Sequence, residues 1–118
     1  MNIETLREYC LNKKGVSDSF PFDDNALVFK VLNKMFLIIP INSNPLNFTA
    51  KCDPYKAVKL REEYESINPG YHTNKKHWNT IEVNPDISDD LIYDLVNHSY
   101  DLVVSGLTIK DKEKLNSM

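Results

Sequence analysis

Four short apolar segments between residues 16 and 51 constrain the fold more than any other feature of the sequence. They are rich in the β-branched and aromatic residues that favour strands, and they cover residues 16–22, 26–32, 35–41 and 47–51. Turn-forming residues separate them, among them Asp23, Asp24 and Asn25, and then Asn33 and Lys34. Strands joined by loops this short have to be antiparallel. The sequence therefore predicts an antiparallel meander, with a tight hairpin at Asn33 and Lys34.

Helical patterns lie before and after this meander. The spacing of apolar residues predicts a helix over residues 3–12, which Gly15 ends. Asp53 is a good N-cap and Pro54 a good first-turn residue, so a second helix is expected to begin there. We expect the turn sequence at residues 68–70 to stop it.

The last third of the chain predicts one strand or a strand pair, and then a long helix. Residues 76–83 alternate in the manner of a strand, with Trp78, Thr80 and Glu82 on one side. Ser88 is expected to cap a helix over residues 89–105, which carries a wide apolar stripe. The lysine-rich tail after Thr108 predicts a short terminal helix. Since strands run together and helices lie apart, the predicted class is α+β, one domain over residues 1–118 with helices packed on one face of an antiparallel sheet.

The composition indicates in which cellular compartment this domain is expected. Only Cys10 and Cys52 are present, too few for a disulfide framework and typical of a reducing compartment. The N-terminus has no secretory pattern. The apolar run over residues 35–41 is far shorter than the roughly 20 residues of a membrane span. We therefore expect a cytoplasmic protein, without a membrane partner and monomeric.

Charge is distributed unevenly along the chain. The formal net charge of −3 counts against a strong nonspecific binder of polyanions. Residues 51–77 nevertheless hold six basic and four acidic residues, whereas residues 78–109 contain no lysine or arginine and six acids. The sequence therefore predicts a molecule with two oppositely charged regions and leaves room for a local basic patch.

The densest group of functional residue types runs from Asn68 to Thr80, with the sequence N-P-G-Y-H-T-N-K-K-H-W-N-T. Lysines suit phosphates, amides suit base edges and flat rings suit stacking, so the segment has the residue types of a nucleic-acid contact. The alternative is a hairpin in which Tyr71 and Trp78 pack in the core while Lys75 and Lys76 are merely solvated. Composition alone leaves both interpretations open.

Three segments resemble the MmcQ/YjbR family: K-C-D-P-Y-K-A-V-K-L-R-E-E-Y from Lys51, I-N-P-G-Y-H-T-N-K-K-H-W-N-T-I from Ile67, and S-Y-D-L-V from Ser99. The resemblance extends over nearly the whole chain. It implies a CyaY-like two-layer fold, described for the family as a double-wing arrangement and proposed to bind DNA. The ending departs from the family pattern, because Asp111 and Glu113 alternate with the lysines there.

The leading hypothesis is a non-catalytic DNA-binding module that contacts phosphates through a basic patch. Its predicted contact residues, from the segment and the resemblance together, are Lys51, Arg61, His72, Asn74, Lys75, Lys76, His77 and Asn79. Trp78 is expected to be a partly buried anchor of its strand. No catalytic residue, metal site or cofactor is predicted, since no nucleophile context or metal-ligand spacing is present. The rival hypothesis is a chaperone-like module that binds another protein through an exposed sheet face or edge.

Overall fold

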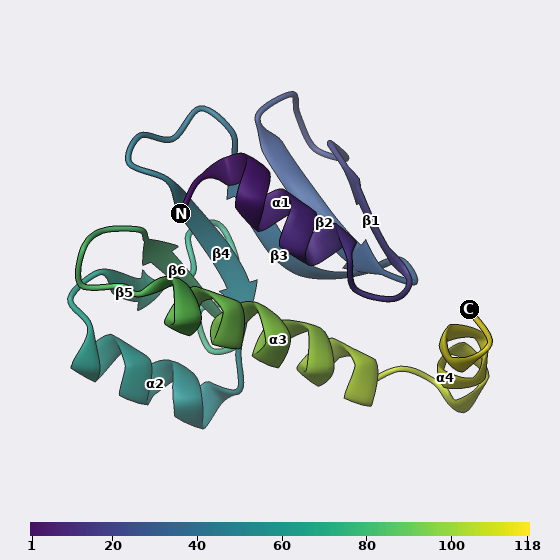
Figure 1. The fold of residues 1–118 in the computed structure, drawn as a ribbon. Coiled ribbons are helices and arrows are strands. Elements are labelled where there is room, and N and C mark those ends of the chain that lie inside the picture. Colours follow the sequence, from purple (N-terminus) through teal and green to yellow (C-terminus); the bar gives the residue numbers. More distant parts are fainter.

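The structure, a computed structural model that describes residues 1–118, is built on a six-stranded antiparallel sheet with four helices (Figure 1). In chain order the elements are α1 (Ile3–Leu11), β1 (Val16–Ser19), β2 (Ala26–Val31), β3 (Lys34–Pro40), β4 (Asn47–Lys51), α2 (Pro54–Glu63), β5 (Ile67–Pro69), β6 (Trp78–Glu82), α3 (Asp89–Ser105) and α4 (Ile109–Asn116). The predicted α+β class and the antiparallel sheet are confirmed.

The strands lie in the order β1-β2-β3-β4-β6-β5. The first four form the predicted meander. β6 then pairs with β4, and β5 lies outside it as an edge strand. The helix before β5 ends earlier than predicted, at Glu63. Residues 67–69, which overlap the turn predicted at 68–70, pair with β6, so that of the two predicted alternatives the strand pair is present.

The hairpin between β2 and β3 differs by one residue from its predicted position. Its two central residues are Leu32 and Asn33, with φ of 44° and 71°, and Val31 pairs with Lys34 across them. A two-residue turn of this kind needs positive φ at both positions. Asn33 tolerates that conformation whereas a leucine does not, so Leu32 gave no turn signature in the sequence.

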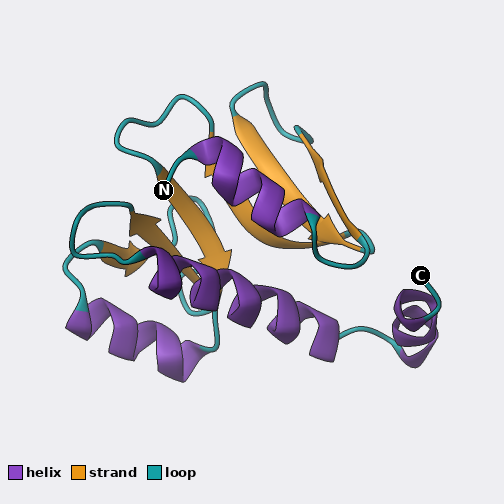
Figure 2. Cartoon of the chain, viewed as in Figure 1, coloured by secondary structure: helices purple, strands orange, loops and turns teal.

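Helices α1, α2 and α3 lie on one face of the sheet, and α4 lies beyond its end next to the β2–β3 turn (Figure 2). All four contribute to one core. Leu6 of α1, Leu60 of α2, Val96 of α3 and Leu115 of α4 belong to the same buried cluster. The pairing of β2 with β3 shifts register between Phe29 and Lys30, which leaves Phe36 of β3 without a partner on β2. At a bulge two residues oppose one, and here the consecutive residues Phe36 and Leu37 both join the helix-side cluster.

The opposite face of the sheet carries the alternate residues of each strand. Thr49 pairs with Thr80 and Lys51 pairs with Trp78 on neighbouring strands, and the two threonine hydroxyls are 2.7 Å apart. Trp78 is buried but does not belong to the helix-side cluster. We call this surface the open face. No helix is long and apolar enough to cross a membrane.

The C-terminal helix is held against the turn that precedes β1, and Gly15 lies at the contact. Gly15 has a φ of +75°, and an added Cβ would lie 2.6 Å from Leu115 Cδ1. Gly15→Ala is therefore expected to lower the free energy of unfolding by about 1–3 kcal/mol, measured by urea denaturation.

Gly106→Ala is the matched control. Gly106 has a φ of −90°, and the nearest atoms to an added Cβ are two carbonyl oxygens at 3.6 Å and 3.9 Å. The free energy of unfolding of the Gly106→Ala variant should stay within about 0.5 kcal/mol of that of the original protein, or rise slightly. Equal losses of stability in the two variants would contradict the proposed role of Gly15.

Candidate nucleic-acid interface

The loop between β5 and β6, residues 70–77, contains most of the predicted contact residues. Its base is closed by the Gly70 N–H, which donates to the Trp78 carbonyl at 2.9 Å. Within the loop, the His77 N–H donates to the Asn74 carbonyl at 3.1 Å. The His77 carbonyl in turn accepts from the Cys52 N–H at 2.8 Å, just beyond the end of β4. The loop is therefore held at the end of the sheet where β4 stops and β6 begins.

Arg61 connects α2 to this loop. Its Nε donates to Asn79 Oδ1 at 2.7 Å, and its Nη2 donates to the carbonyls of Trp78, at 3.2 Å, and Lys75. A planar guanidinium with several fixed donors suits such a group of acceptors. Arg61 was predicted to contact phosphate, but its Nε and Nη2 donate to the protein itself.

Asn79, also predicted as a contact residue, is only 2% exposed. Its oxygen accepts from Arg61, and its Nδ2 donates to the Ala57 carbonyl at 3.3 Å. Both ends of the amide are therefore used within the protein. We remove Asn79 from the set of side chains available to a ligand and assign it, with Arg61, to positioning the loop.

Close packing fixes the first half of the loop. An added Cβ at Gly70 would lie 2.6 Å from Trp78 Cβ and closer still to the Thr73 hydroxyl. The Thr73 Oγ1 is buried without a hydrogen-bond partner. Tyr71 follows, and its N–H donates to Thr80 Oγ1 at 3.0 Å, which anchors the loop on the open face. Only glycine fits at position 70.

Three predicted lysines lie around this loop. Lys51 projects over the Trp78 ring, with Nζ 5.4 Å from the ring centroid. Lys75 Nζ donates to the Gly70 carbonyl at 3.0 Å, while Lys76 is exposed. The molecule has two ion pairs, from the N-terminus to Asp89 and from Arg7 to Asp18, so none of these lysines is paired with an acid.

The remaining predicted residues differ in exposure. His72 is exposed and has a φ of 57°, and its ring centroid is 4.0 Å from that of Tyr71. Asn74 is exposed, and its oxygen accepts from the Lys76 N–H at 3.0 Å, which leaves its NH₂ group as a donor. His77 is half-buried beside β4. The structure thus brings Lys51, His72, Asn74, Lys75 and Lys76 together at one end of the sheet.

The two ends of the sheet differ in charge. In or next to the end where β4 stops lie the lysines Lys13, Lys14, Lys30, Lys34, Lys51, Lys75 and Lys76. One acid, Asp53, lies at this end directly after β4, and α4, whose lysines alternate with Asp111 and Glu113, packs against Gly15 beside it. In or next to the opposite end lie Asp23, Asp24, Glu65, Glu82, Asp86, Asp89 and Asp90. We call these the lysine end and the acidic end. Four of the lysines were not predicted as contacts. These four lysines could have been predicted from the direction of the strands, because every second connection of an antiparallel meander lies at the same end of the sheet.

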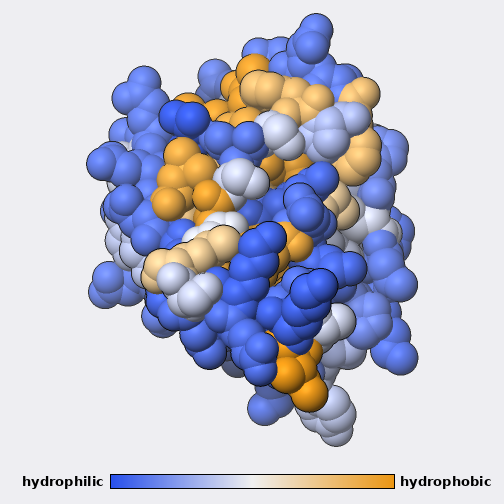
Figure 3. Space-filling model, turned by 90° about the vertical axis from the view of Figure 1, so that its right-hand side faces the viewer, coloured by the Kyte–Doolittle hydropathy of each residue, from blue (hydrophilic) through white to orange (hydrophobic).

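The surface on the side of α4 and the β2–β3 turn is mostly hydrophilic, with a few separate hydrophobic patches rather than one continuous area (Figure 3). The lysine end is therefore not covered by a large apolar surface on the side seen in this view. No group of three or more His, Cys, Asp or Glu residues could hold a metal ion.

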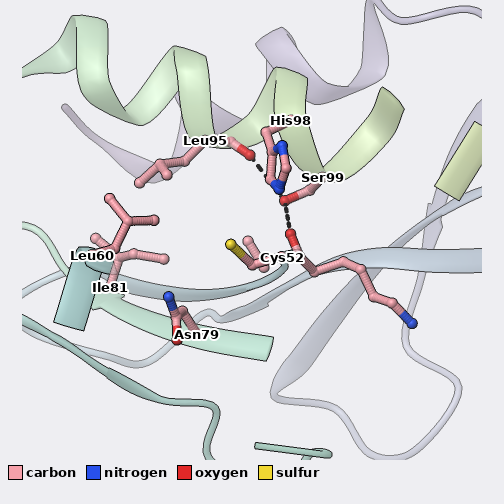
Figure 4. Close-up of a pocket in the computed structure, with 9 residues that line it drawn as sticks. Cys52, Leu60, Asn79, Ile81, Leu95, His98 and Ser99 are labelled. Carbon is pink, nitrogen blue, oxygen red and sulfur yellow. Dashed lines mark hydrogen bonds between the residues drawn. The ribbon is translucent and has the colours of Figure 1, made fainter. Parts of the chain in front are cut away.

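A small cavity of about 10 Å³ lies behind the lysine end, between β4, β6 and α3 (Figure 4). It has room for about one water molecule. Cys52 points into it, and the Ser99 hydroxyl lies within hydrogen-bond distance of the carbonyls of Lys51 and Leu95. His98 Nε2 accepts from the Asp53 N–H at 3.0 Å. These contacts tie the end of β4 to α3 rather than forming a ligand site.

The family model described as YjbR matches residues 11–102, which include loop 70–77. The chain belongs to the YjbR family. It is 36% identical to the uncharacterized protein YbdF of Escherichia coli O157:H7, over 95% of this chain and 92% of that protein. It is 33% identical to the uncharacterized protein YjbR of Escherichia coli K12, over 98% and 97% of the two chains.

Solved structures agree with this YjbR assignment. The crystal structure of Deinococcus radiodurans protein DR2400 matches with a TM-score of 0.90 and 37% identity, over 98% of this chain and 88% of that one. A Pseudomonas syringae protein matches with a TM-score of 0.72 at 24% identity, over 86% and 98%, which supports the fold alone. The family resemblance seen in the motifs is confirmed.

Removing Arg61 tests its role in holding the loop. Arg61→Ala leaves Asn79 Oδ1 and the Lys75 carbonyl without the Arg61 donor, while the Trp78 carbonyl keeps the Gly70 N–H, so the free energy of unfolding should fall by about 1–3 kcal/mol in urea denaturation. Arg61→Lys should not restore the lost stability, because a single ammonium group cannot replace the planar set of N–H donors of a guanidinium. The control is Lys59→Ala on the exposed side of the same helix, expected within about 0.5 kcal/mol of the original protein.

His98 predicts a pH dependence of stability. Burial lowers its pKa from the ordinary 6.5, with nearby Lys56 acting in the same direction and Asp53 and Asp101 opposing. Below 6.5 the unfolded chain takes up the proton before the folded protein does, so the free energy of unfolding should fall as pH drops toward the lowered pKa. Urea denaturation between about pH 7.5 and about pH 5 measures this slope. His98→Gln, which cannot titrate, should show a smaller dependence of the free energy of unfolding on pH. An unchanged dependence would contradict the assignment of this effect to His98.

Proposed function

We propose that this protein is a non-catalytic module that binds DNA at the lysine end of its sheet. The observation that carries the proposal is the gathering of unpaired lysines at one end of a molecule whose net charge is −3. A phosphate backbone is attracted by local positive charge within about 10 Å, whatever the sign of the whole molecule. The acidic end would repel the same backbone, so the charge distribution favours one orientation.

The residues of the lysine end have different roles in this proposal. Lys51 and Lys76 contact phosphates, and Lys75 does so if it leaves the Gly70 carbonyl. The NH₂ group of Asn74 and the imidazole of His72 supply hydrogen bonds at the same surface. Arg61 and Asn79 position the loop and do not contact DNA. His77, half-buried beside β4, supports the loop from behind.

Two observations speak against Cys10, Cys52 and His98 as catalytic residues of this module. Burial raises the pKa of Cys52 to about 11 and that of Cys10 to about 12, so neither thiol is a nucleophile near neutral pH. His98 uses Nε2 to accept a backbone N–H and is held as a structural group. The two cysteines are free thiols, which supports the proposal of a cytoplasmic location.

A second function, binding of another protein, is favoured by one apolar patch. Phe20, Phe22 and Ile41 are exposed at the acidic end, Phe22 by 66%, next to the edge strand β1. Asp24 lies in the same loop and has no ion-pair partner. An extended partner segment with an apolar residue beside a basic one would suit this patch. Peptide binding that persists at about 0.5 M salt and is abolished in Phe22→Asp would favour this second function.

DNA binding is tested by fluorescence anisotropy with labelled DNA at about 50 mM and about 200 mM salt. The double variant Lys51→Ala, Lys76→Ala should bind several-fold more weakly. For duplex DNA its plot of log K against log salt should be shallower by about 0.9 for each phosphate that the variant no longer neutralises. The effect should be similar for different DNA sequences, since phosphate contacts carry no sequence information.

The control compares two single variants with the same change in net charge: Lys76→Ala in the loop, and Lys59→Ala on the exposed side of α2, outside the lysine end. Lys76→Ala should weaken binding, whereas Lys59→Ala should retain the original affinity and slope. Equal weakening by the two single variants would mean that net charge, and not the lysine end, determines binding. No salt-dependent binding by the original protein would exclude the proposed function.

A further inference from the structure

Two aromatic side chains stand exposed beside the unpaired lysines. The Tyr71 side chain is 70% exposed, and its ring centroid is 4.0 Å from the imidazole of His72 at an angle of 57°. Trp78, seven residues later in the same motif, is only 6% exposed. The Trp78 ring is therefore buried against the sheet, whereas the loop presents Tyr71 and His72 to solvent.

The backbone beneath these rings is fixed. The Tyr71 N–H donates to Thr80 Oγ1 at 3.0 Å, and that hydroxyl is 2.7 Å from Thr49 Oγ1 on the next strand. Gly70, on the other side, is packed too closely against Trp78 to accept a Cβ. His72 is held at a φ of 57°, a conformation that few residues other than glycine adopt. A ring presented from a fixed backbone loses little conformational entropy when a ligand stacks on it.

Phosphate-binding groups lie on the same side of the molecule. Lys51 and Trp78 project from the open face in the row next to Thr49 and Thr80, on which Tyr71 is anchored. Lys75 Nζ reaches the Gly70 carbonyl, directly before Tyr71. Flat rings beside lysines match an unpaired strand, whose bases expose their faces while its phosphates remain negative. In a duplex those base faces are covered by neighbouring base pairs.

We propose that Tyr71, supported by His72, is a stacking platform for the bases of unpaired DNA, so that the protein binds single-stranded DNA in preference to duplex. This inference rests on the proposed DNA-binding function and specifies its substrate class. Tyr71 supplies the ring, Lys51 and Lys76 hold the phosphates, and Arg61 keeps the loop in place. Stacking does not depend on base identity, so the preference is for unpaired strands rather than for a sequence.

The test compares the binding of an oligothymidine of about 15 nucleotides with that of a duplex of the same length. Tyr71→Ala should weaken binding of the single strand by about five- to a hundredfold and change duplex binding little. Tyr71→Phe should retain binding, because the ring and not the hydroxyl is needed. Phe22→Ala, which removes an exposed ring at the acidic end, is the matched control and should bind as the original protein does.

Tyr71→Trp adds a spectroscopic measure of stacking. The only natural tryptophan, Trp78, is buried, so a change in the exposed indole fluorescence reports on position 71. Oligothymidine should quench this fluorescence, and duplex should not. Equal affinity for the two DNA forms, with no effect of Tyr71→Ala and no quenching, would overturn the stacking inference and leave DNA binding intact. Absence of binding to either form would overturn both.

Discussion

The guanidinium of Arg61 is the interaction on which the candidate interface depends. It joins α2 to loop 70–77 and to the start of β6 through Asn79, Trp78 and Lys75. Because Asn79 is buried and also bound to the α2 backbone, the loop is connected to the core by a polar network rather than by apolar packing alone. The positive charge of Arg61 remains near the surface without a carboxylate partner, so it still adds to the local potential while its donors hold the loop.

The topology of the sheet, more than the composition, determines the charge distribution. Lys34 and Lys51 are far apart in the sequence, yet an antiparallel meander places both at the same end. Asp23 and Glu82 lie at the other end for the same reason. The net charge of −3 averages over two regions of opposite sign and therefore says little about what either one attracts.

Local patterns in the sequence were enough to predict most of the elements. Side-chain caps at Asp53 and Ser88 located the starts of α2 and α3, since those contacts involve residues two or three positions apart. The pairing of β5 with β6 was left open as one strand or a strand pair, because three residues carry too little periodicity to decide. The role of Arg61 was misjudged because its acceptors lie 14 to 18 residues away, and a sequence shows a charge without showing what the fold places opposite it.

The length of loop 70–77 sets it apart from the hairpin turn between β2 and β3. Two residues are enough to join antiparallel strands, as Leu32 and Asn33 do, both at positive φ. The loop between β5 and β6 spans residues 70–77 and buries the Thr73 hydroxyl without a partner, which costs free energy. Positive φ at His72 does not distinguish this loop, because the short turn has it as well. The extra length, the buried hydroxyl and the exposed Tyr71 beside unpaired lysines are therefore the features that support the proposal of a ligand at this loop.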